Sequence, residues 1–106
     1  MPRFLIEGNY TNDGTKGLLQ EGGSRRRETV TKLIEGMGGS VEAFYYSFGE
    51  RDVIVIYSAP DDATALALSM AVNQTGKVRL TTHPLLSVED VDQAAKKTVA
   101  YRPPGA

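Results

Sequence analysis

The run Val53-Ile54-Val55-Ile56-Tyr57 decides the fold, because all of its side chains are apolar or aromatic. Successive side chains of a strand point to opposite faces of its sheet, so a strand of this composition needs cover on both faces. We therefore expect the run to lie at the centre of a sheet. The segment Ser40–Phe48 precedes it across the turn Gly49-Glu50-Arg51-Asp52, and its aromatic and β-branched residues predict a β-hairpin.

Two more strands and several helices are predicted around this hairpin. The strands are Phe4–Asn9 and Lys77–His83, and Pro84 is expected to end the second of them. A helical region follows the turn cluster Tyr10–Gly14 and is interrupted at Gly22-Gly23. Apolar spacing and capping residues predict further helices over the segments 24–37, 63–72 and 87–99, the first with Ser24 as its N-cap and the last with Ser87.

This order of elements predicts an α+β fold, a ferredoxin-like βαββαβ sandwich with an additional C-terminal helix. It has one antiparallel four-stranded sheet, in which we expect the first and third strands at the centre and parallel to each other. We expect a single domain over residues 1–98 and a flexible C-terminal tail over 99–106.

The helices of such a fold cover one face of the sheet, yet the second strand is apolar on both. Alternation predicts one face with Val41, Ala43 and Tyr45 and another with Phe44, Tyr46 and Phe48. An apolar face without cover marks an interface or a ligand groove. The expected partner is a second copy of the chain, so we predict a homo-oligomer that associates through the open sheet face.

Composition excludes several classes of function. Among the 106 residues, twelve Lys and Arg balance thirteen Asp and Glu, so no global positive field attracts nucleic acid. Cysteine is absent, which excludes disulfides and thiolate chemistry. No apolar stretch has the length of a signal peptide or of a membrane span, and we expect a cytoplasmic protein with neither nucleic-acid nor membrane partners.

Several short motifs occur one after another along the chain. They are Gly8-Asn9-Tyr10-Thr11-x-x-Gly14, Ser24-x-x-Arg27, Gly38-Gly39, Phe44-Tyr45, Gly49-Glu50-x-Asp52 and Ala59-Pro60-Asp61-Asp62. Over residues 3–96 the chain resembles the GYD domain family. The resemblance implies a small bacterial or archaeal ferredoxin-like domain, similar to the dimeric α+β barrel group, with no agreed reaction. The family's tyrosine is expected at position 51, where this sequence has Arg51.

Charged residues on the first and last strands form the first candidate site. A register that places Asn9 opposite Lys77 would set Glu7 beside Arg79 and Arg3 beside His83. Glu7 and Arg79 would then form either a structural salt bridge or a site where Arg79 binds a carboxylate or phosphate.

His83, the only histidine, is the weak candidate for a catalytic base, with Asp52 as its orienting partner. The alternative is a capping or surface histidine. No second histidine at helical spacing accompanies it, so no metal site is predicted.

Other polar residues allow a ligand site at the opposite end of the sheet. Asn9, Tyr10 and Glu42 are expected to gather there around a small polar ligand, unless Asn9 serves only the backbone of the turn. Arg25-Arg26-Arg27 begins a helix and is either a phosphate site or a solvated face. The residues predicted to contact a ligand are Asn9, Tyr10, Tyr46 and Arg79.

No nucleophile motif, pair of catalytic carboxylates or phosphate-binding loop supports an enzyme, and no cofactor is predicted. The leading hypothesis is a non-enzymatic homo-oligomeric module that binds a small metabolite at or near the subunit interface, with ligand-sensing regulation as a variant of it. The alternative is a cofactor-independent monooxygenase or isomerase of the barrel-dimer type. Its pocket would be lined by Phe44, Tyr46, Arg79 and His83.

Overall fold

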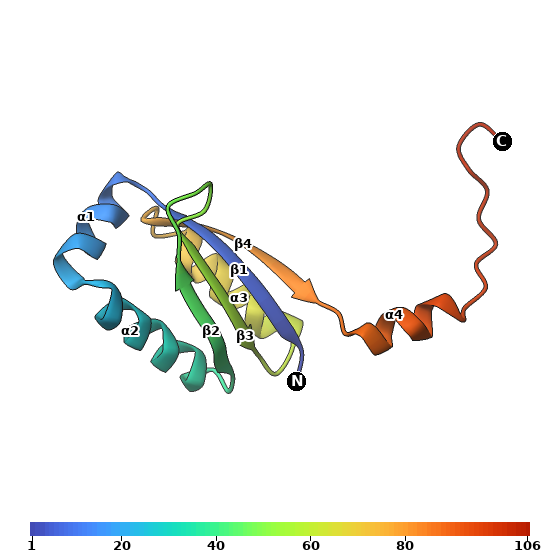
Figure 1. The fold of residues 1–106 in the computed structure, drawn as a ribbon, viewed down its shortest axis with the longest axis horizontal. Coiled ribbons are helices and arrows are strands. Elements are labelled where there is room, and N and C mark those ends of the chain that lie inside the picture. The colour runs from blue at the N-terminus through green and yellow to red at the C-terminus, as the bar shows by residue number, and fades with distance from the viewer.

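The computed structural model describes all 106 residues. Along the chain the elements are β1 (Arg3–Tyr10), α1 (Asn12–Glu21), α2 (Gly23–Gly36), β2 (Ser40–Tyr46), β3 (Val53–Ser58), α3 (Asp62–Asn73), β4 (Val78–Leu85) and α4 (Val88–Ala95). Figure 1 shows the four strands as one sheet, with α3 behind it and α2 at its left. None of the helices combines the length and the apolar character that a membrane span needs.

The strand order β2-β3-β1-β4 confirms the predicted α+β ferredoxin-like sheet. β3 and β1 lie at the centre as predicted, but the expectation that they run parallel is wrong, because all three neighbouring pairs are antiparallel. The apolar run of β3 therefore has a strand on each side.

The core lies between the sheet and two of the helices. Phe4 and Ile6 of β1 and Val53, Val55 and Tyr57 of β3 point to this side. They pack against the few helical residues that are also buried, which are Ile34 of α2 and Ala65 and Leu68 of α3. Both helices thus cover the same face of the sheet, and the other face has no layer of its own chain over it.

Side chains fix the starts of three helices. Thr11 accepts a hydrogen bond from the Gly14 N–H at the start of α1, and Asp61 accepts one from the Thr64 N–H at the start of α3. These bonds with Thr64 also hold the pKa of Asp61 below its usual value. Ser87 caps α4 as predicted and forms a capping box with Asp90.

The predicted cap of α2 is wrong. Gly22, not Ser24, stands before α2, and it also ends α1 by donating its N–H to the Leu18 carbonyl. Its φ of 85° is a conformation that glycine adopts without strain. One glycine thus turns the chain between two helices, and Ser24 falls inside the second.

The structure also corrects three details of the predicted strands and last helix. A β-bulge between Val41 and Ala43 puts Val41 on the helix-covered side with Phe44, whereas Tyr45 and Ala43 lie on the other side. β4 continues through Pro84 to Leu85 because it is an edge strand, where a missing N–H need not cost a ladder hydrogen bond. α4 ends at Ala95, short of the predicted Val99.

Residues 86–106, here called the C-terminal arm, leave the rest of the molecule at the end of β4 (Figure 1). Every residue of the arm is exposed. The radius of gyration is 17.1 Å, whereas a compact domain of this length has a value of about 13 Å. The arm therefore gives the single chain an unusually extended shape.

Tyr57 is 1% exposed, and its hydroxyl has no hydrogen-bond partner. Tyr57→Phe should therefore raise the free energy of unfolding at neutral pH, by about 1 kcal/mol. Burial also raises the pKa of Tyr57 above its ordinary value. The unfolded chain then loses this proton first, so the native state loses stability as the pH rises above ~10, and the variant should lose less.

Urea unfolding followed by circular dichroism at neutral and alkaline pH would measure both effects. Tyr101→Phe is the matched control, because Tyr101 is exposed in the arm. A Tyr57→Phe protein less stable than wild type at neutral pH would contradict this account.

Candidate functional site

The side of the sheet away from α2 and α3 is here called the open face. Its centre is apolar, with Leu5 of β1 and Ile54 and Ile56 of β3 half-buried beside one another. Polar side chains surround this centre. The residues of the open face are Leu5, Glu7, Asn9, Ala43, Tyr45, Ile54, Ile56, Arg79, Thr81 and His83.

Glu7 joins two other charged or titratable side chains on this face. Its Oε2 accepts a hydrogen bond of 3.3 Å from Arg51 Nε and lies 3.5 Å from His83 Nε2. The three residues come from β1, from the β2–β3 turn and from β4, so the sheet brings together positions that are far apart in sequence. They form the Glu7–Arg51–His83 cluster, in which one carboxylate stands between a guanidinium and an imidazole.

The predicted pairing of Glu7 with Arg79 is wrong. Asn9 is the residue opposite Arg79, which shifts β4 by two residues from the expected register. A hydrogen bond of 2.9 Å from the Thr11 N–H to the Lys77 carbonyl fixes this alignment. Arg79 consequently has no carboxylate within ion-pair distance and remains free on the open face.

The expected neighbour of Arg3 also changes with the register. Leu85 stands opposite Arg3, whose Nε instead lies 2.8 Å from Glu42 Oε1 on β2. Glu42 is therefore at the Arg3 end of the sheet, away from Asn9 and Tyr10, and the three predicted companions do not gather.

Asp52 and Asn9 hold the β2–β3 turn against β1. Asp52 Oδ2 accepts a 2.9 Å hydrogen bond from the Tyr10 N–H, and the Asp52 N–H lies 2.9 Å from the Gly8 carbonyl and 3.1 Å from Asn9 Oδ1. The Asp52 carboxylate is thus engaged with backbone. The structure places Glu7, not Asp52, beside His83, so the predicted dyad does not form.

Tyr10 and Tyr46 lie on the helix side, away from Asn9 and Arg79. The Tyr46 hydroxyl donates a 2.9 Å hydrogen bond to the Gly23 carbonyl. Burial raises the pKa of both tyrosines, and the Tyr46 phenol raises the pKa of Tyr10 further. The neighbouring Arg26 acts in the opposite direction and lowers the pKa of each tyrosine. The pocket expected from Phe44, Tyr46, Arg79 and His83 is absent, because its aromatic and basic members lie on opposite sides of the sheet.

Several hollows lie on the helix side, and two of them adjoin each other. An apolar cleft between α2 and α3 encloses about 60 Å³ and has Arg26 as its one charged wall. Small-molecule pockets usually need about 300 Å³ or more. A wider groove of about 380 Å³ between α1 and α3 adjoins the cleft and shares Tyr10 and Arg26 with it. Of the residues predicted to bind a ligand, Tyr10 borders this groove, whereas Asn9 and Arg79 are on the open face.

Sequence reasoning placed Glu7 on the polar side of the first strand but missed Arg51 as its partner. The signal that could have identified this partner is Arg51 itself, a basic residue at the position where the resemblance led us to expect a tyrosine. Arg26 was considered only as part of an arginine run, although it is the member that reaches Tyr10. The chain contains no group of three His, Asp or Glu side chains that could hold a metal ion.

We expect Asp52→Ala to lower the free energy of unfolding by about 1–3 kcal/mol, because it leaves the part-buried Tyr10 N–H without an acceptor. Asp52→Asn retains an oxygen acceptor and should lose clearly less. Urea unfolding of the two variants measures the difference. Equal stability of all three proteins would show that the turn does not depend on this carboxylate.

No curated protein and no solved structure matches the chain. The model of the GYD domain family matches residues 4–95, which include all four helices and, except for Arg3 at the start of β1, all four strands. The protein belongs to the GYD domain family.

Proposed function

We propose that the protein is a homo-oligomeric module whose subunits associate through the open face and bind a small molecule there. This proposal rests on one observation: an uncovered apolar centre and a charged cluster lie side by side on the open face. The apolar centre consists of Leu5, Ile54 and Ile56, and the charged cluster is the Glu7–Arg51–His83 cluster. An apolar patch bordered by polar groups is typical of interfaces and of ligand sites.

The exposed area supports association. The chain exposes 7650 Å², whereas a compact monomer of its mass exposes about 5800 Å². The excess is larger than the surface that each partner buries in a standard interface, about 800 Å². Association would remove much of this excess.

The charges on the open face favour an anionic ligand with an apolar body. Arg51 and Arg79 supply two positive charges against the single negative charge of Glu7, and His83 can add a third when protonated. A carboxylate would meet these cations at the margin of the open face, and its apolar part would lie beside the apolar centre that a second subunit covers. Covering by a second subunit would exclude water and strengthen these contacts.

A second candidate function is a cofactor-independent enzyme of the barrel-dimer type, and the contact between His83 and Glu7 favours it. A carboxylate that orients an imidazole is a common arrangement for a general base. In this reading His83 would remove a proton from a substrate enclosed between two open faces. Full turnover by His83→Ala on a substrate of the wild-type protein would eliminate that role.

Native mass spectrometry of freshly purified protein should show an oligomer. Tyr45→Asp should shift it toward monomer, because the substitution places a charge on the open face where Tyr45 is 69% exposed in the single chain. Leu66→Asp is the matched control: Leu66 is 60% exposed on α3 and lies outside the open face. A wild-type protein of monomer mass at every concentration would refute the association.

The ligand class is tested with benzoate as the probe. We expect benzoate to raise the melting temperature of the wild-type protein and of Leu66→Asp, and to raise that of Arg79→Ala much less, because Arg79 has no carboxylate partner of its own. The same melting-temperature increase in Arg79→Ala would show that the open face does not select the anion.

A further inference from the structure

No residue of the C-terminal arm, residues 86–106, is buried against its own chain. We propose that α4 of one copy packs on the open face of a second copy, so that the subunits exchange their arms. This inference rests on the association proposed above and adds which segment makes the interface.

α4 is an amphipathic helix without a partner. Its apolar side chains Val88, Val91 and Ala95 follow one another at spacings of three and four residues and therefore lie on one side of the helix. Val88 is 74% exposed and Val91 60% exposed. A helix of only eight residues is marginal in water without tertiary packing, even with the capping box at Ser87. The apolar side of α4 thus needs a surface that the single chain does not provide.

The open face matches α4 in character and in size. Both surfaces are apolar along their centre and charged at their margins. A helix of this length measures about 12 Å, and four neighbouring strands span about 15 Å between the outer two. α4 can therefore cross the sheet and cover Leu5, Ile54 and Ile56.

Charge complementarity favours the same pairing. Glu89 and Asp92 of α4 have no basic partner, and Arg79 on the open face has no acidic one. Asp92 lies beside the apolar side of the helix, where it would face a basic residue on the covered sheet. The acidic side of α4 is thus complementary to the positively charged margin of the open face.

The course of the chain directs the arm outward. Only Leu86 and Ser87 separate β4 from α4, and α4 lies beyond the end of β4 (Figure 1). A hollow of about 560 Å³ remains between the start of the arm and the open face, bordered by Arg3, Ile56 and Leu86. The match to the family ends at residue 95, so α4 belongs to the family's domain and is not an appended tail.

The test uses the absence of cysteine, which makes an introduced thiol unique. Gln93→Cys on the polar side of α4 carries a nitroxide, and this protein is mixed with equal parts of ¹⁵N-labelled wild-type chain. We expect intermolecular broadening of the amide signals of Leu5, Ile54 and Ile56. A nitroxide on Leu66→Cys, on the outer side of α3, is the control and should leave these signals sharp.

An oligomer by native mass spectrometry whose open-face signals stay sharp in the mixed sample would overturn the arm exchange and leave the association standing. A monomer would overturn both.

A pair of charge substitutions gives an independent measurement. Val91→Asp should raise the dissociation constant of the oligomer at least about tenfold, since burial of a valine is lost. Gln93→Asp adds the same charge to the opposite side of α4 and should change the constant by much less. Equal dissociation constants for wild type, Val91→Asp and Gln93→Asp would refute the proposal.

Discussion

The structure depends on one constraint: both central strands carry apolar side chains to two faces of a sheet, and the chain has helices for only one. On the covered side, Phe4, Val55 and Tyr57 form a dry core with α2 and α3. On the other side, Leu5, Ile54 and Ile56 remain half-buried with no layer above them. The open face is therefore available for contact with another molecule, and the proposals above describe how a second chain would cover it.

The architecture could be predicted from the sequence because the strongest local signals agree with the global fold. The apolar run at 53–57 could only be a central strand, and the alternation of Val78, Leu80 and Thr82 with Arg79, Thr81 and His83 correctly divided the last strand between two faces. The start of α2 was missed because a glycine can cap a helix without any side-chain signal.

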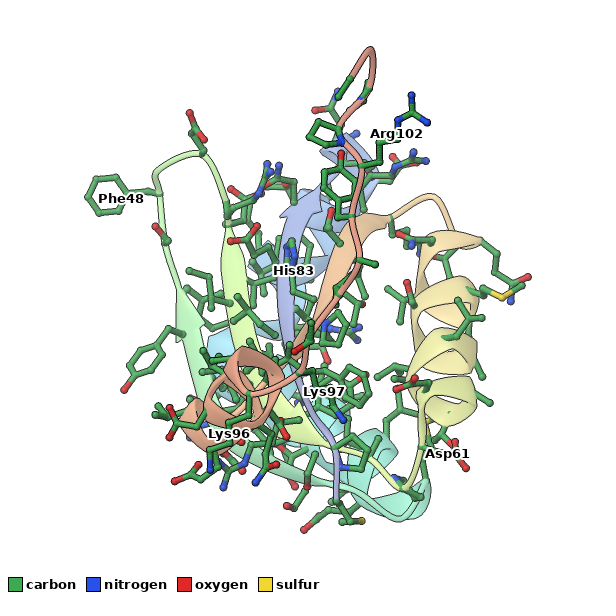
Figure 2. The ribbon with its side chains drawn as sticks, turned by 90° about the vertical axis from the view of Figure 1, so that its right-hand side faces the viewer. Phe48, Asp61, His83, Lys96, Lys97 and Arg102 are labelled. Atoms are coloured by element: carbon green, nitrogen blue, oxygen red, sulfur yellow. The ribbon has the colours of Figure 1, made fainter.

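The candidate site was less predictable, because it depends on register and not on alternation. A shift of two residues preserves which side chains share a face but changes every neighbour across the ladder. The hydrogen bond between Thr11 and Lys77 sets that shift, and periodicity does not reveal it. The bulge after Val41 has the same effect in β2, since one extra residue moves Val41 to the core. Asn9 and Asp52 are engaged with the backbone of the turn, so the chemistry of the open face centres on Glu7, Arg51 and His83. Of these three residues, His83 is labelled in Figure 2.

Pro84 and the bulge in β2 have a consequence for how copies of the protein can meet. The two edges of a sheet present unpaired backbone groups to which foreign strands can add, and this addition can continue without limit into fibres. Here one edge strand contains a proline, which cannot donate to a new ladder, and the other is kinked by its bulge. Both edges thus resist lateral growth. Contacts across faces, in contrast, saturate once each face is covered, so the association proposed above would give closed particles of fixed size and not open-ended polymers.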